Sequence, residues 1–435
     1  MENYANWPET YPDPSWFIHD RFGLFIHFGL FSVASRHEWL MTTEQIDPTL
    51  YADNYFKHFN PDLFDADTWA QEAKRCGVKY MVFTTKHHEG FALWDSQLTD
   101  FKITNTPFKR DLLAELLPAM RKVGIKIGLY HSLIDWKHPD FPVDGLHPQR
   151  DVPSYRESNQ HRNLKKYQDY LAGQVEELLT NYGKIDYMWF DFSYSHRDWG
   201  WSQGKGARDW DSPRLEALCR RLQPDMLLND RLDLGRGVTT PEQFQPDKPL
   251  EKDGHPVLWE ACQTMNGTWG YDRDNLDWKS SEMLLKMLID TVAKNGNFLM
   301  NVGPNSRGEI DPRSLLRTRA IGEWMRLHQD AILGAGYCAD YQAPADCRYT
   351  QKGNKLYLHL FSYPYRNLHL KGIAEKVEFI RLLNDGSEIQ YRGFDPDEVI
   401  TSTEAIIAPE DIVITLPIEK PAVLVPVVEI TLKEN

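Results

Sequence analysis

The feature that most constrains the fold is a regular alternation in the first three quarters of the chain. Short runs of apolar residues are separated by longer amphipathic stretches, and the runs lie at residues 23–29, 79–86, 126–132, 185–192, 225–231, 257–264 and 297–304. Strands that alternate with helices indicate βα units and a parallel sheet. Nearly continuous apolar runs are typical of strands that are buried on both faces. We therefore predict an α/β fold, an irregular TIM-like (β/α)8 barrel in which one strand is hidden or missing.

Helix start and stop signals support this interpretation. In residues 64–77, Asp65 or Asp67 can cap the start of a helix and Gly77 can end it. Further helices are predicted at residues 111–124, 162–182, 213–223, 280–296 and 315–333. The competing architecture is a doubly wound open sheet, which usually carries a Gly-rich phosphate loop. Neither GxGxxG nor GxxxxGKS follows any of the predicted strands.

The pattern changes after about Gly336. Short segments at residues 355–362, 377–383, 411–416 and 422–432 alternate apolar and polar residues and are separated by turns rich in Asn, Gly, Asp and Pro. This period of two, without helices, is typical of an antiparallel β-sandwich. We predict a catalytic barrel domain at residues 1–335 and a C-terminal β-sandwich domain at residues 336–435, a division that suits a chain of 435 residues.

Charge and composition exclude several classes of partner. The net charge is -14, whereas proteins that bind nucleic acids usually present a basic face. No apolar run reaches the roughly 18 residues that a membrane span needs. The N-terminal residues show no signal peptide, and the five scattered cysteines form no CxxC motif. We expect a cytoplasmic protein that binds neither nucleic acid nor membrane.

Polar and aromatic residues gather where the predicted strands end. Parallel barrels carry their chemistry at the carboxyl ends of the strands, and here these ends and the loops after them hold His27, His37, Glu38, Trp39, Lys86, His87, His88, Glu89, Tyr130, His131, Trp189, Asp191, Asn229, Asp230, Arg231, Trp259 and Glu260. Asp191 is the most informative, because it directly follows the apolar run YMWF. Burying a carboxylate there costs several kcal/mol unless it is paired or has a function.

Two kinds of chemistry fit such a rim. Metal-dependent hydrolysis is disfavoured because HxH and HExxH motifs are absent and because His87 and His88, if both lie on a strand, point in opposite directions. Glycoside hydrolysis needs one ionised carboxylate and one protonated carboxyl group. Neutral His, Tyr and Trp side chains can then hold sugar hydroxyls. We therefore expect a glycosidase with no metal and no cofactor.

Taken together, the strand-end motifs resemble glycoside hydrolase family 29, the α-L-fucosidases. The matching segments are FGLFIHFG (22–29), HEW (37–39), TKHHEGF (85–91), WFD (189–191), NDR (229–231), WGY (269–271) and KNGNFLMNVGP (294–304). The resemblance extends over residues 14–335 in the same order. It implies a barrel followed by a β-sandwich, a fucosylated oligosaccharide as substrate, and removal of terminal α-L-fucose with retention of configuration. A homo-oligomer is common for such enzymes.

The resemblance also implies roles for single residues. Asp191 corresponds to the nucleophile that forms a covalent glycosyl-enzyme, and Arg231 nearby would favour its ionised state. The resemblance implies that the fucose hydroxyls are held by His27, His87, His88 and Trp189. It places Glu38 and Trp39 in the sugar-binding loop and Tyr130 beside the nucleophile. Trp269 would pack against the C6 methyl group.

The general acid/base is implied by one loop. The segment TTPEQFQP at residues 239–246 resembles the loop that carries this residue in some members, which favours Glu242. Glu260 is the second candidate, and Glu89, which replaces an Asp in the usual form of its motif, is the third. Retention requires the two carboxyl groups to lie about 5–5.5 Å apart when substrate is bound.

Three other functions remain open at this stage: a catalytically silent carbohydrate-binding protein on the same scaffold, a metal-dependent hydrolase, and another exo-glycosidase such as a β-galactosidase-like enzyme. The presence of both Asp191 and Glu242 argues against the silent protein.

Overall fold

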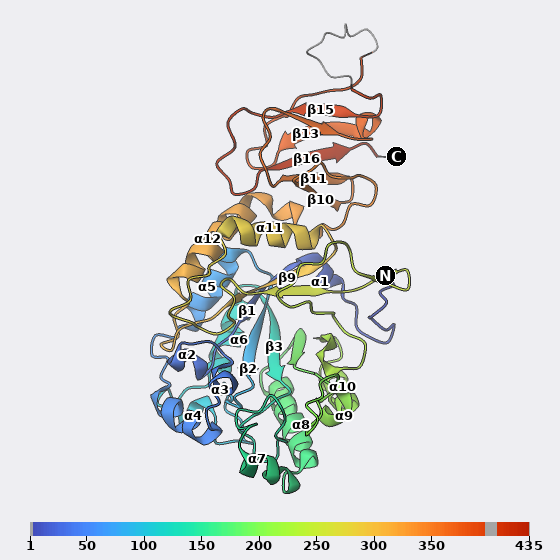
Figure 1. The fold of residues 1–435 in the computed structure, drawn as a ribbon. Coiled ribbons are helices and arrows are strands. Elements are labelled where there is room, and N and C mark those ends of the chain that lie inside the picture. Colours follow the sequence, from blue (N-terminus) through green and yellow to red (C-terminus); the bar gives the residue numbers. More distant parts are fainter. Residues whose placement is uncertain (1–2, 396–406, 435) are drawn as a thin grey trace.

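The computed structural model describes residues 3–395 and 407–434. Its N-terminal part is built around a curled, parallel sheet of seven strands in the order β5-β4-β3-β2-β1-β9-β8 (Figure 1). The strands are β1 (Phe22–Ile26), β2 (Tyr80–Lys86), β3 (Lys126–Ser132), β4 (Tyr187–Asp191), β5 (Leu227–Leu228), β8 (Glu260–Gln263) and β9 (Asn297–Val302). Each predicted run contains one of these strands, so the predicted irregular barrel is confirmed.

An irregular segment closes the gap between the two edge strands. Within residues 238–242, Val238 forms a parallel bridge with Asn229, Thr239 with Trp259, and Glu242 with Cys262. The backbone N–H groups of residues 238 and 239 donate to the carbonyls of residues 228 and 258, both at 2.9 Å. This segment, called the seam below, takes the place of the hidden eighth strand.

The longer helices pack outside the sheet and agree with the prediction. They are α5 (Ala66–Cys76), α6 (Leu112–Lys122), α8 (Leu164–Asn181), α10 (Ser212–Leu222), α11 (Ser281–Val292) and α12 (Pro312–His328). At the start of α5 the Asp65 side chain accepts a hydrogen bond from Thr68 N, as an N-cap does. Gly77, with φ of 90°, ends the helix in the left-handed conformation that glycine tolerates.

Several short helices were not predicted. They are α1 (Ser15–Asp20), α2 (Phe31–Ala34), α3 (Leu40–Thr43), α4 (Pro48–Tyr55), α7 (Pro153–Glu157) and α9 (Ala207–Trp210). The segments after β1 and β3, with α2, α3, α4 and α7, lie at the end of the barrel that faces away from the C-terminal strands (Figure 1). A short hairpin of β6 (Glu251–Lys252) and β7 (His255–Pro256) precedes β8.

The C-terminal part contains two antiparallel sheets, which confirms the predicted sandwich. One has the order β10-β11-β16-β13 and the other β12-β15-β14. The strands are β10 (Cys347–Lys352), β11 (Lys355–Leu360), β12 (Asn367–Leu370), β13 (Val377–Leu382), β14 (Tyr391–Arg392), β15 (Ile412–Thr415) and β16 (Val427–Leu432). Leu358, Ile380, Ile414 and Ile430 belong to the core between the sheets.

The two parts are in direct contact. The sandwich lies against α11 and α12 (Figure 1). Trp324 Nε1 donates to the carbonyl of Val425 at 2.7 Å, and Arg348 Nε lies 2.7 Å from Asp290 Oδ1. Gly336 forms a bridge with Gln351 of β10, which supports our proposal that the domain boundary lies between residues 335 and 336. Among the described helices, none has the length and apolar character that crossing a membrane requires.

Candidate active site

A cavity of about 190 Å³ opens at the carboxyl ends of the barrel strands. Pockets for drug-sized ligands usually have roughly 300–1,000 Å³, so this cavity has room for a single sugar unit. It is lined by Phe25, His27, Trp39, His87, His88, Tyr130, Trp189, Asp191, Phe192, Glu242, Cys262 and Trp269. This lining includes Asp191, the favoured acid/base Glu242 and all the predicted sugar-binding residues except Glu38 and Arg231.

Strand register explains why residues distant in the sequence meet here. In the parallel pair β3–β4, Tyr130 lies opposite Trp189 and Ser132 lies opposite Asp191. Side chains two residues apart on a strand share a face. Trp189 and Asp191 therefore both point into the barrel, as do Phe25 and His27 at the end of β1.

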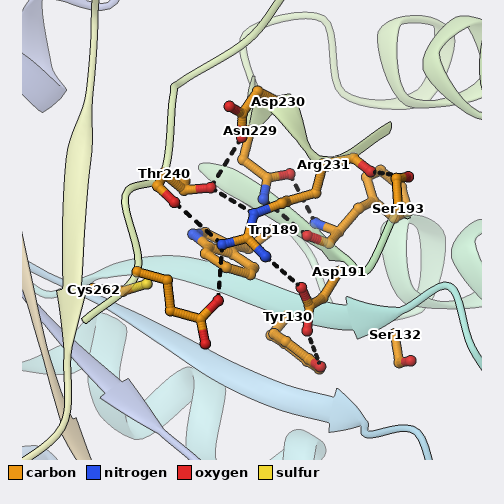
Figure 2. A network of polar contacts seen from close by, with 12 residues as sticks. Tyr130, Ser132, Trp189, Asp191, Ser193, Asn229, Asp230, Arg231, Thr240 and Cys262 are labelled. Atoms are coloured by element: carbon orange, nitrogen blue, oxygen red, sulfur yellow. Dashed lines mark hydrogen bonds and ion pairs between the residues drawn. The ribbon is translucent and has the colours of Figure 1, made fainter. Parts of the chain in front are cut away.

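Asp191 is held by Tyr130 and Arg231 (Figure 2), and His88 lies close to it. The Tyr130 hydroxyl donates to Oδ2 at 2.7 Å, and Arg231 Nη1 donates to Oδ1 at 2.9 Å. His88 Nε2 lies 3.7 Å from Oδ2. Burial raises the pKa of Asp191 to about 6, and the positive charge of Arg231 opposes this rise. The carboxylate is thus ionised at neutral pH in a largely buried position.

Arg231 connects this carboxylate to a second one. Its Nη2 donates to Glu242 Oε2 at 3.0 Å, and its Nε donates to Thr240 Oγ1 at 2.8 Å. The guanidinium lies 5.0 Å from the centre of the Trp189 ring (Figure 2). The Glu242 side chain is 41% exposed, whereas that of Asp191 is 12% exposed. Glu242 therefore stands at the mouth of the cavity and Asp191 at its inner wall.

Hydrogen bonds assign the tautomers of two cavity histidines. His27 Nδ1 lies 2.7 Å from Asn301 Oδ1, and the Asn301 amide donates to the carbonyl of Trp269. His88 Nδ1 lies 2.6 Å from Ser132 Oγ, whose hydroxyl donates to the carbonyl of residue 134. Both Nδ1 atoms therefore carry the proton, and each Nε2 is left as an acceptor. Burial lowers the pKa of His27 to about 3 and that of His88 well below its usual value.

The expectation that His87 and His88 point in opposite directions is wrong. Strand β2 ends at Lys86, so the alternation of side chains does not extend to the two histidines. Both rings line the cavity, with centres 4.2 Å apart. Even so, within residues 3–395 and 407–434 no group of three or more His, Cys, Asp or Glu side chains is arranged to hold a metal ion.

Comparison with known proteins identifies the family. The model of the α-L-fucosidase family matches residues 2–330. The chain belongs to the α-L-fucosidases. It is 30% identical to human tissue α-L-fucosidase over 431 residues, which cover 90% of this chain and 86% of the human protein. The bovine tissue enzyme is also 30% identical, over 82% of this chain and 77% of its own length. The protein is therefore a glycoside hydrolase.

Solved structures agree with this assignment. α-L-Fucosidase isoenzyme 1 from Paenibacillus thiaminolyticus is 41% identical and superimposes with a TM-score of 0.89, covering 97% of this chain and 99% of the other. A family 29 α-L-fucosidase from Bacteroides thetaiotaomicron, solved as a trapped covalent intermediate in a Glu-to-Gln mutant, is 25% identical with a TM-score of 0.82, covering 100% and 98%.

In this α-L-fucosidase, Glu38 lies behind the cavity wall. Its Oε2 accepts hydrogen bonds from the backbone N–H groups of Trp269 at 3.0 Å and Gly270 at 2.8 Å. Burial raises the pKa of Glu38 to about 7. The carboxyl group thus fixes the loop that carries Trp269.

The two other acid/base candidates also lie outside the cavity lining. Glu260 is completely buried inside the barrel, where it accepts hydrogen bonds from Tyr80, Tyr187 and Trp189. Glu89 accepts from Leu30 N at 2.8 Å and from the Tyr51 hydroxyl. Burial raises the pKa of each carboxyl group to about 7.

Three cavity residues of the α-L-fucosidase were missed by the sequence analysis: Phe25, Phe192 and Cys262. Phe25 could have been found, because it precedes His27 by two residues on the same strand face. Phe192 has φ of 111°, a strained conformation directly after Asp191 that turns its ring into the cavity. Nothing in the sequence indicates this backbone conformation at Phe192.

Proposed function

We propose that this protein is a retaining exo-α-L-fucosidase that releases terminal α-L-fucose from oligosaccharides and glycoconjugates. The nucleophile is Asp191 and the general acid/base is Glu242. The observation that carries the proposal is that these two carboxylates contact the two terminal nitrogens of Arg231 at a cavity sized for one sugar. A buried and an exposed carboxyl group at one site is the combination that double displacement uses.

The reaction has two steps. First, Asp191 attacks the anomeric carbon, the bond to the glycosidic oxygen breaks, and Glu242 gives its proton to that oxygen. A covalent fucosyl-Asp191 intermediate results. Next, ionised Glu242 takes a proton from a water molecule, which attacks the anomeric carbon and releases Asp191. The trapped covalent intermediate of the Bacteroides relative supports this course for a structurally similar enzyme.

Glu242 must change its contacts during this cycle. In the structure its carboxylate lies 3.0 Å from Arg231 Nη2, a contact that suits the second step, in which Glu242 acts as a base. The first step needs the protonated form. We infer that substrate entry separates Glu242 from Arg231, because the sugar and its glycosidic oxygen occupy the space between them. The partly exposed side chain is able to rotate in this way.

The remaining cavity residues hold the fucose. His27 and His88 offer Nε2 as acceptors for sugar hydroxyls, and His87 and Trp189 border the same space. Trp39 and Trp269 supply apolar ring surface, with Trp269 against the C6 methyl group. A single methyl contact is worth about 1–3 kcal/mol, so fucose is preferred over sugars that lack the methyl group. Glu38 acts through the Trp269 loop.

The test is hydrolysis of 4-nitrophenyl α-L-fucoside with and without EDTA. We expect release that resists the chelator and disappears in Asp191→Ala. Release that depends on a metal would instead favour a metal-dependent hydrolase. If the wild-type protein released nothing from this compound or from a panel of fucosylated oligosaccharides, the silent binding protein would be the better explanation.

The role of Glu242 has a separate test. Glu242→Ala is expected to reduce turnover of substrates with poor leaving groups far more than turnover of aryl fucosides, because aryl leaving groups need little protonation. Glu251→Ala, at an exposed carboxyl group of β6, is the matched control. Equal losses of Glu242→Ala on both substrate types would count against the assignment.

A further inference from the structure

We propose that Phe244 is a specificity-determining residue that binds the sugar unit to which fucose is attached. This inference rests on the proposed function. The cavity holds one sugar, so the rest of the substrate must leave through the mouth where Glu242 stands. Since the acid must reach the glycosidic oxygen, the leaving group passes directly beside Glu242.

Phe244 lies next to that path. It follows Glu242 by two residues, so the two Cα atoms are at most about 7.6 Å apart. The side chain of Phe244 is among the exposed large apolar groups, with 62% of its surface accessible. An apolar ring beside the mouth of a polar site offers a surface for the C–H face of a pyranose.

The residues on both sides of Phe244 are anchored by hydrogen bonds. The preceding residue, Gln243, is anchored to β8: its N–H donates to Cys262 O at 3.0 Å, and its side-chain amide donates to Thr264 Oγ1 at 2.7 Å. The following residue, Gln245, donates to Met287 O at 3.0 Å and to Thr291 Oγ1 at 3.1 Å. These bonds hold the chain on both sides of Phe244, whose own side chain is exposed.

This arrangement predicts the class of leaving group. An exposed ring on an anchored stretch of backbone near the acid can pack against a pyranose or another flat apolar face. We therefore infer that fucosides linked to a sugar unit are better substrates than fucosides whose leaving group has no such face.

The experiment compares two substrates in Phe244→Ala. For a fucosyl disaccharide, kcat/KM is expected to fall roughly 3- to 10-fold, mainly through KM, as the loss of one stacking contact predicts. For α-L-fucosyl fluoride, whose leaving group is a single atom, kcat/KM should be unchanged, and so should inhibition by free L-fucose. Phe244→Trp should restore the disaccharide activity. Tyr365→Ala, which removes an aromatic ring that is 83% exposed in the C-terminal domain, is the matched control.

The outcomes separate this inference from the proposed function. If the wild-type protein hydrolyses neither substrate, the proposed function fails. If it hydrolyses both and Phe244→Ala reduces both equally or neither, the function stands and the role of Phe244 is wrong. A loss on the disaccharide that Phe244→Trp does not restore would also overturn the inference.

Discussion

At the scale of single residues, the charge of Arg231 governs the acid–base chemistry of the cavity. It favours the ionised form of Asp191, which burial alone would push towards protonation. Glu242 has the opposite effect on Asp191, because two negative charges close together disfavour each other. Burial thus raises the pKa of Asp191 most, one cation lowers it and one anion raises it further, and each charge can be removed separately.

We expect kcat/KM on 4-nitrophenyl α-L-fucoside to fall as the pH drops below about 6, since protonated Asp191 cannot attack. Arg231→Met should move this acid limb to higher pH, because the charge that lowers the pKa of Asp191 is lost. Glu242→Gln should move it to lower pH. Full pH–rate profiles of the three proteins check this prediction, and identical acid limbs would contradict it.

At the scale of elements, the shortest barrel strand depends on one side chain. Strand β5 has two residues, and directly after it the Asn229 amide group donates to Phe190 O at 2.8 Å and accepts from Phe190 N at 3.0 Å (Figure 2). These two bonds replace the ladder that a longer strand would form with β4. They also help to position Asp191, which follows Phe190, and Arg231, which lies two residues after Asn229.

Asn229→Ala is therefore expected to lower the free energy of unfolding by about 2–4 kcal/mol, because it leaves two buried backbone groups without partners. Activity of the folded protein should fall as well, since Arg231 loses its fixed position. Urea unfolding and aryl fucoside assays measure the two effects. Asn105→Ala, which removes an exposed bond to Asp100 O, should change stability by less than about 0.5 kcal/mol.

The strands and helices also show which features of the fold can be predicted from the sequence alone. Each predicted apolar run overlaps a strand, and for Lys126–Ser132 both bounds agree, because burial on both faces leaves a clear pattern. The seam was not predicted, because bridges formed by backbone groups of the polar residues TTPE leave no apolar run. The short helices α2, α3 and α7 have too few residues for a periodic signal.

The residues of the candidate site likewise divide into those that the sequence predicts and those that it does not. Most cavity residues follow the ends of strands, and the barrel topology necessarily brings these ends together. Phe192 and Cys262 were missed because their orientation depends on a strained backbone and on the seam. Glu38 was placed in the correct loop, but the sequence could not show that its carboxyl group faces the backbone of Trp269.

At the scale of the whole molecule, the sandwich has its own core but also packs a few residues into the hydrophobic cluster that surrounds the barrel. Tyr357, Val425 and Val427 from the C-terminal part belong to the same buried cluster as the barrel residues. Trp324 of α12 lies in this cluster and donates to Val425 O. Every residue that lines the cavity comes from the barrel part, so the sandwich contributes to stability without contacting the cavity.

Trp324→Ala is expected to cost about 3–5 kcal/mol of stability, because it creates a cavity between the two parts. Calorimetry should show a Tm lowered by several degrees. At 25 °C, kcat/KM of the folded protein should stay within about twofold of the wild type. Phe379→Ala, at an exposed aromatic residue of β13, is the control. A large loss of activity without unfolding would show that the sandwich influences the cavity.

The seam has a consequence for how such enzymes diverge. A residue inserted into a regular strand moves every following side chain to the other face. The regular register of β4 therefore fixes the position of Asp191 relative to its neighbours. The seam has three isolated bridges in place of a continuous ladder, so we expect residues 238–242 to tolerate changes of length better than β4 does. Lineages can therefore shift the proton donor along the chain without rebuilding the barrel. We then expect sequence alignment to match the nucleophile reliably and to misplace the general acid/base, whereas superposition of structures should match both.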